Sequence, residues 1–135
     1  MGVMEAQVEL SPMEMWVTAL RSGAYKQTRN ALHDSDGFSC LDVACDIYDK
    51  RFPGKLRIDI IDQGIHAYEG NIKRLPQKVK DWLGLVSGIG EYGNRQSLIY
   101  DNDYRILNFS EIADIIERRP PRLFKRETTS NVAWS

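Results

Sequence analysis

The sequence contains little cysteine, little histidine and no long apolar run, and each shortage excludes a class of protein. Its 135 residues include two cysteines and two histidines. Cys40 and Cys45 have four residues between them, a spacing that suits neither a disulfide framework nor a Cys-x-x-Cys metal or redox site. No apolar run approaches the ~20 residues of a membrane-spanning helix. We therefore expect two reduced, core-packed thiols, no metal, no cofactor and no membrane partner.

Neither sign of charge is in excess. Lys and Arg number 18 against 19 Asp and Glu, so the formal net charge is −1. A chain with this balance has no overall attraction for nucleic acid or anionic lipid, and either role would need a local patch. The stretch from Met1 to Glu5 lacks the basic and then apolar segments of a secretory signal. The sequence therefore predicts a cytoplasmic protein.

The periodic features that are present predict an α+β fold with a single core, because four segments combine helical apolar spacing with start or stop signals. These are a helix that begins at Ser11-Pro12 and ends before Gly23, one over 41–48 that Pro53-Gly54 stops, one from Leu75-Pro76 to Gly84, and one that Asn108 caps and Pro120-Pro121 stops. We expect about four short helices packed on small antiparallel hairpins. The globular domain is predicted over 11–119, with an N-terminal extension over 1–10 and a basic, Pro-containing C-terminal arm over 120–135.

Three pairs of extended segments are predicted beside these helices. The first is a hairpin over 25–40 that turns at Asp36-Gly37, and the second pairs the alternating residues 56–60 with 65–68. The third consists of short strands over 98–100 and 104–107. Its connection, Asp101-Asn102-Asp103, is typical of a solvated turn.

Two glycine- or aspartate-containing motifs lack the context that their chemistry requires. The stretch Gly88–Gly93 fits G-x-G-x-x-G, yet it follows a predicted helix, whereas a dinucleotide-binding loop leaves a strand and opens a helix. Asp34–Gly37 begins like a calcium-binding loop, but the sixth and twelfth positions are Ser39 and Cys45 instead of glycine and an acid. We interpret both as turns or surface loops.

One nucleophilic arrangement stays open. Cys40 could be activated by His33 across the predicted first hairpin, because a thiolate at neutral pH needs a base or a positive environment. The interpretation that we favour is core packing, since Cys40 directly precedes an apolar helix face and no known catalytic motif surrounds it. No catalytic residue is therefore predicted.

The feature that stands out is a basic run near the C-terminus. Five cations occur within the nine residues 118–126, and two adjacent prolines would hold the run extended. Cations with apolar side chains between them suit an acidic protein surface or phosphates, although a charge run is commonly only a solvated tail. The predicted partner-binding residues are Arg118, Arg119, Arg122, Leu123, Phe124, Lys125 and Arg126.

Four motifs in a fixed order give the chain a family resemblance. They are Trp16-x-x-Ala19-Leu20-Arg21-Ser22-Gly23-x-Tyr25-x-Gln27, Phe38-Ser39-Cys40-Leu41-x-Val43-x-Cys45-Asp46, Leu75-Pro76-x-x-Val79-x-x-Trp82-Leu83-Gly84-Leu85, and Asn102-Asp103 followed by Phe109-Ser110-Glu111-Ile112-Ala113-Asp114-Ile115-Ile116-Glu117. On these motifs the chain resembles a family of small uncharacterised proteins of tailed bacteriophages and prophages. Asp42 departs from the glycine usual in that family, and the arm after Pro120 lies outside the shared pattern.

The resemblance implies an origin and no catalytic residues. Such proteins are accessory gene products made inside an infected bacterium, where small non-catalytic binders of host or defence proteins are common. The leading hypothesis is a binding module for a host or phage protein in the bacterial cytoplasm. The alternatives are nucleic-acid binding through residues 118–126 and a small enzyme with a Cys40/His33 centre. The sequence leaves the oligomeric state open.

Overall fold

The computed structural model of the chain describes residues 10–28, 37–61 and 64–126. Its helices are α1 (Pro12–Arg21), α2 (Cys40–Arg51), α3 (Gln77–Leu83), α4 (Leu98–Asp103) and α5 (Phe109–Glu117), and its strands are β1 (Ile58–Ile61), β2 (Ile65–Tyr68), β3 (Glu91–Gly93) and β4 (Gln96–Ser97). Helices α1, α2, α3 and α5 and the hairpin β1–β2 lie where the sequence predicts them. The predicted α+β class, with short helices and small antiparallel hairpins, is confirmed.

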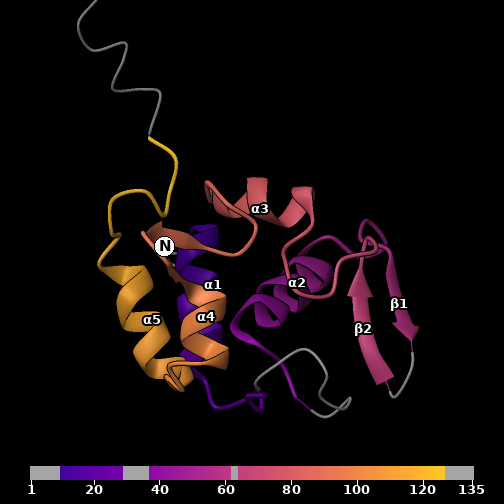
Figure 1. The fold of residues 1–135 in the computed structure, drawn as a ribbon. Coiled ribbons are helices and arrows are strands. Elements are labelled where there is room, and N and C mark those ends of the chain that lie inside the picture. The colour runs from indigo at the N-terminus through magenta and orange to yellow at the C-terminus, as the bar shows by residue number, and fades with distance from the viewer. Residues whose placement is uncertain (1–9, 29–36, 62–63, 127–135) are drawn as a thin grey trace, which may run out of the picture.

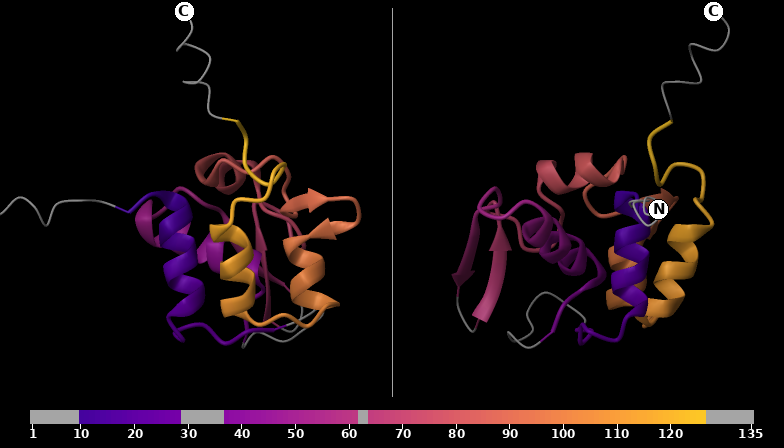
Figure 2. Two further views of the ribbon diagram at one scale, coloured as in Figure 1. Left: turned by 90° about the vertical axis from the view of Figure 1, so that its left-hand side faces the viewer. Right: turned by 180° about the vertical axis from the view of Figure 1, so that it is seen from behind.

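Helices α1, α4 and α5 stand side by side, and α2 lies between this group and the hairpin β1–β2 (Figures 1 and 2). Helix α1 packs against both α5 and α2, and α3 covers one end of α1 and α2. The buried side chains form one hydrophobic cluster that all five helices enter. Among the described residues, no helix has the length and apolar character that crossing a bilayer would require.

Reciprocal caps explain why three of the helices begin where they do. In each, the first residue outside the helix accepts a hydrogen bond from the third helical residue, whose acidic side chain accepts one in return. The pairs are Ser11 with Glu14, Ser39 with Asp42, and Asn108 with Glu111. These interactions are local in sequence, so they specify the residues at which α1, α2 and α5 begin.

The centre of the core joins α1 to α2. The side chain of Trp16 is fully buried, and its Nε1 donates a hydrogen bond to the Cys40 carbonyl oxygen at 2.9 Å. Cys40 and Cys45 are both buried free thiols, as the sequence predicts.

The segment over 96–107 differs from the prediction. Residues 98–103 form helix α4 instead of a strand, and 104–107 contains no strand. The helix begins because the Ser97 side chain accepts a hydrogen bond from the Tyr100 backbone N–H at 3.2 Å. The preceding residues, expected to be irregular, instead form the antiparallel hairpin β3–β4, whose register is interrupted between Glu91 and Gly93.

The predicted hairpin over 25–40 is also corrected. Residues 29–36, which include the expected turn at Asp36, lie outside the described residues. The flanking segments meet in a single parallel bridge between Gln27 and Phe38, not in an antiparallel ladder. Apolar and polar residues alternate poorly over the described flanks, which does not favour a longer ladder there.

Candidate functional site

The basic segment, defined here as residues 118–126, is folded onto the body of the protein. The Lys125 backbone N–H donates to the Gly84 carbonyl at 2.8 Å, and the Val86 N–H donates to the Leu123 carbonyl at 3.0 Å. These two bonds form an antiparallel bridge between Leu85 and Phe124. The chain as far as Arg126 is therefore part of the folded structure and not a free arm.

Leu123 anchors this segment. Its side chain is fully buried and belongs to the hydrophobic core. A hydrogen bond from its backbone N–H to the Pro120 carbonyl, at 3.1 Å, closes the turn that directs the chain inward. The expectation that Leu123 is presented to a partner is thus corrected, because a core side chain has no surface to offer.

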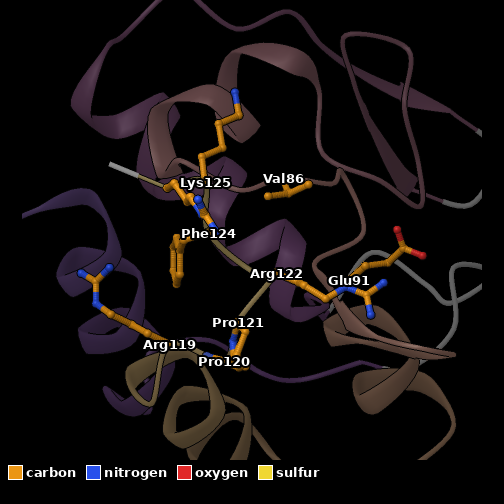
Figure 3. Close-up of a pocket in the computed structure, with 9 residues that line it drawn as sticks. Val86, Glu91, Arg119, Pro120, Pro121, Arg122, Phe124 and Lys125 are labelled. Carbon is orange, nitrogen blue, oxygen red and sulfur yellow. The ribbon is translucent and has the colours of Figure 1, made fainter. Parts of the chain in front are cut away.

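Two arginines on either side of Pro120-Pro121 adopt the left-handed backbone conformation. The φ angle is +49° at Arg119 and +85° at Arg122. Each such conformation costs about 1–2 kcal/mol for a residue with a Cβ atom. The folded body sustains this cost, and both arginines are exposed in the turn (Figure 3).

A groove of about 540 Å³ runs along the basic segment (Figure 3). Its lining combines apolar side chains with cations and a single carboxylate. The lining residues are Val86, Glu91, Arg119, Pro120, Pro121, Arg122, Phe124, Lys125 and Arg126. The sequence alone offered no signal for Val86 and Glu91, because a backbone bridge and a short hairpin bring them there from another part of the chain.

The cations of the groove are not equivalent. The Arg119 guanidinium lies over the Phe124 ring, 5.1 Å from its centroid. Lys125 Nζ lies 3.6 Å from Asp81 Oδ1. A hydrogen bond from Gln77 and then the charge of Lys125 lower the pKa of that carboxyl. Arg122 and Arg126 make no ion pair with any residue in the described part of the chain, so both charges remain available to a partner.

The structure brings five of the seven predicted partner-binding residues together in the groove lining. They are Arg119, Arg122, Phe124, Lys125 and Arg126. Arg118 is exposed at the end of α5 but does not line the groove, and Leu123 lies in the core. The run of cations in the sequence therefore indicated the groove residues. The sequence did not indicate which residues of the run line the groove and which lie in the core.

The arrangement around Cys40 does not favour nucleophilic chemistry. Burial raises the pKa of its thiol well above the usual value, and the nearby carboxylate of Asp103 raises it further. The Sγ atom lies 3.6 Å from the Leu98 carbonyl oxygen inside the core. His33, the suggested base, lies outside the described residues. A neutral, enclosed thiol has no route to a substrate.

The polar residues expected in a solvated turn are instead buried in a structural network. Both Asp101 and Asn102 are fully buried. The Asn102 side-chain oxygen accepts from Gln27 Nε2 at 2.9 Å and from the Cys40 backbone N–H at 3.2 Å, and its nitrogen donates to the Thr28 carbonyl at 2.9 Å. Asn102 therefore holds three segments of the chain together.

The glycine-containing motif of the sequence does not have the structure of a dinucleotide-binding loop. The stretch Gly88–Gly93 runs into strand β3 and not into a helix, so it has no helix N-terminus for a phosphate. Gly90 is needed for packing, because a Cβ atom there would lie 2.9 Å from the Leu98 side chain. The calcium-like residues 34–36 lie outside the described residues. Within residues 10–28, 37–61 and 64–126, no three His, Cys, Asp or Glu side chains gather as metal ligands would.

Fold and groove together define a small α+β protein that carries a groove of mixed cationic and apolar lining. The chain belongs to the family described as a domain of unknown function, DUF8296, whose model matches residues 9–120. No curated protein and no solved structure matches the chain. The matched region contains all the described helices and strands and ends at Pro120, so part of the groove lining lies beyond it.

Proposed function

We propose that this protein is a non-catalytic binding module that holds an acidic segment of a protein partner in the groove along the basic segment. One observation carries the proposal: the guanidinium groups of Arg122 and Arg126, which have no ion-pair partner among the described residues, line the same groove as Phe124 and Val86. Carboxylates would form charge-assisted hydrogen bonds with the guanidinium groups, and neighbouring apolar side chains would contact the ring.

The lining fits an acidic protein segment better than a nucleic acid. The Phe124 ring has Arg119 over it, so that face is not free to stack on a base. Lys125 is already close to Asp81. Few cations remain for a phosphate backbone, whose binding depends on many such contacts.

The cellular setting is part of the same proposal. The family resemblance described above supports a phage or prophage accessory protein that acts in the bacterial cytoplasm. Its partner would then be a host or phage protein with an exposed acidic segment.

Fluorescence anisotropy tests the proposal with a labelled peptide that alternates Glu with Leu and Phe. The wild-type protein is expected to bind it, and the double variant Arg122→Ala/Arg126→Ala is expected to bind at least about tenfold more weakly, because two charge-assisted hydrogen bonds are lost. The matched control is Lys26→Ala/Lys73→Ala, which removes two exposed cations elsewhere and is expected to change nothing.

Two results would overturn the proposal. One is the absence of peptide binding, or an equal loss in the control variant. The other is tighter binding of single-stranded DNA of the same charge, with an affinity that falls steeply as salt rises, which would establish nucleic-acid binding in its place.

A further inference from the structure

The outer edge of strand β1 has no partner in the described part of the chain. The sheet that contains it has two strands, β1 and β2, and β2 separates β1 from helix α2 (Figures 1 and 2). The hairpin is packed on the core through Tyr68 of β2, but the open edge of β1 is a template for another strand. The basic segment, whose residues line the groove, lies on the opposite side of the molecule from β1 (Figures 1 and 2), so the edge and the groove are separate surfaces.

The register shows which backbone groups face outward. The Glu69 N–H donates to the Arg57 carbonyl at 2.8 Å, and Ile58 lies opposite Tyr68. Because inward bonding alternates along an antiparallel strand, residues 59 and 61 bond to β2 and the backbone groups of Ile58 and Ile60 point away from it. No backbone bond from elsewhere in the described residues reaches these outward groups.

The side chains of the same strand are unusually apolar for an exposed edge. Ile60 is 66% exposed and Ile61 is 42% exposed. Alternating apolar and polar residues, as over 56–60, are typical of a half-buried strand, but the hairpin projects beyond the body and leaves Ile60 and Ile61 uncovered (Figure 1). Arg57 and Asp59 share the opposite face from Ile58 and Ile60, and Arg57 Nε lies 3.1 Å from Asp59 Oδ2.

We propose that a second copy of this chain pairs with this edge, β1 antiparallel to β1, in a symmetric dimer. Only three two-fold registers of β1 against its copy place outward-facing residues opposite one another. The first pairs Ile58 with Ile58, the second Ile58 with Ile60, and the third Ile60 with Ile60. The second puts Asp59 opposite Asp59, and the third puts Asp59 opposite Ile61. The first puts each Arg57 opposite the Asp59 of the second copy, so charge complementarity selects it.

This dimer joins two hairpins into one four-stranded sheet, which is a more stable unit than either hairpin alone. Its contact is a short edge, so the association belongs to the weak class of interfaces, with a dissociation constant of about 10–1,000 µM. It is independent of the proposed function, because the groove remains open in the dimer.

Sedimentation velocity of the full chain from about 10 µM to about 1 mM tests the register through a charge exchange. Arg57→Asp leaves acids at both 57 and 59, and Asp59→Arg leaves arginines at both positions, so like charges would face each other in either homodimer. Each variant alone is expected to dimerise at least about tenfold more weakly than the wild type. An equimolar mixture is expected to form heterodimers, because the acids of one chain then face the arginines of the other.

The mixture also controls for folding, since two unfolded variants could not restore a specific dimer. A wild-type chain that stays monomeric to about 1 mM would overturn the proposal. So would single variants that dimerise like the wild type, or a mixture that stays monomeric. None of these results bears on the peptide titration, which reports on Arg122 and Arg126.

Discussion

Arg105 reaches back along one turn of chain to Asp101, and its Nη1 lies 3.1 Å from the Asp101 Oδ1. The two side chains have opposite environments, because Asp101 is fully buried while about half of Arg105 is exposed. The Tyr92 hydroxyl donates to the other carboxylate oxygen of Asp101. A buried carboxylate depends on such partners, since removing one leaves charge without compensation.

We predict that Arg105→Met lowers the free energy of unfolding, but by less than the loss of a fully buried ion pair, because solvent screens the exposed guanidinium. The double variant Arg105→Met/Asp101→Asn is expected to recover most of the loss, because the neutral amide needs no counter-charge. Urea denaturation at pH 7 measures both. An unchanged unfolding free energy in Arg105→Met would contradict the role assigned to this pair.

Asp42 gives the stability of the protein a specific dependence on pH. Burial raises the pKa of its carboxyl to about 6, although hydrogen bonds from Ser39 oppose the shift. The unfolded chain has a pKa of about 3.9 at this group. The protonated form is therefore favoured by folding, and its stabilising contribution is complete below about pH 4 and is lost as the pH rises through about 6.

We predict that Asp42→Asn is more stable than the wild type at pH 7, by about 1–3 kcal/mol, and equally stable at pH 4. The amide oxygen can still accept the hydrogen bond from the Ser39 N–H, so the cap on α2 survives. Urea denaturation at pH 4, 5, 6 and 7 gives the difference between the two proteins. Opposite contributions from other carboxyls cancel in that difference, and a difference that is constant with pH would refute the assignment.

Ile106 has a strained backbone conformation, although its side chain is largely exposed. Its φ angle is +59°, a conformation that is a genuine outlier for a β-branched residue, and its side chain is 59% exposed. The turn that follows α4 imposes this conformation, because the Leu107 N–H donates to the Asp101 carbonyl at 3.0 Å.

We predict that Ile106→Gly raises the free energy of unfolding by about 0.5–1.5 kcal/mol, because glycine occupies the left-handed region without a Cβ penalty. Ile106→Val is the matched control, since it retains the branched Cβ and is expected to bring no gain. Thermal and urea denaturation report the change. A glycine variant less stable than the valine variant would show that the side chain contributes packing which outweighs the strain.

The predictable parts of the fold are those that local interactions specify. Helix α1 and helix α5 each combine a capping box with a regular apolar stripe, and both signals lie within one short stretch of sequence. Helix α4 has neither a long stripe nor a familiar ending, and its Asp101 and Asn102 are typical turn residues. Their burial depends on partners such as Gln27, 75 residues away in the sequence. No local pattern carries that information.

The candidate site, too, could be predicted from the sequence only in part. Its cations were visible as a run, because charge does not depend on folding. Leu123 was not separable from Phe124 in the sequence, since both stand between charges with no period to distinguish an inward side chain from an outward one. Backbone pairing with residues 84 and 86 decides between them.

The anchoring of Leu123 also affects the entropic cost of binding a ligand in the groove. A tail in solution must give up its conformational freedom when it binds, at about 1–2 kcal/mol for each backbone residue that becomes fixed. The core contact and the two backbone bonds to residues 84 and 86 hold the guanidinium-bearing turn in place before any partner arrives. Under the proposed function, even a short acidic motif would therefore meet a preorganised receptor, and most of the ordering cost of binding would fall on the partner.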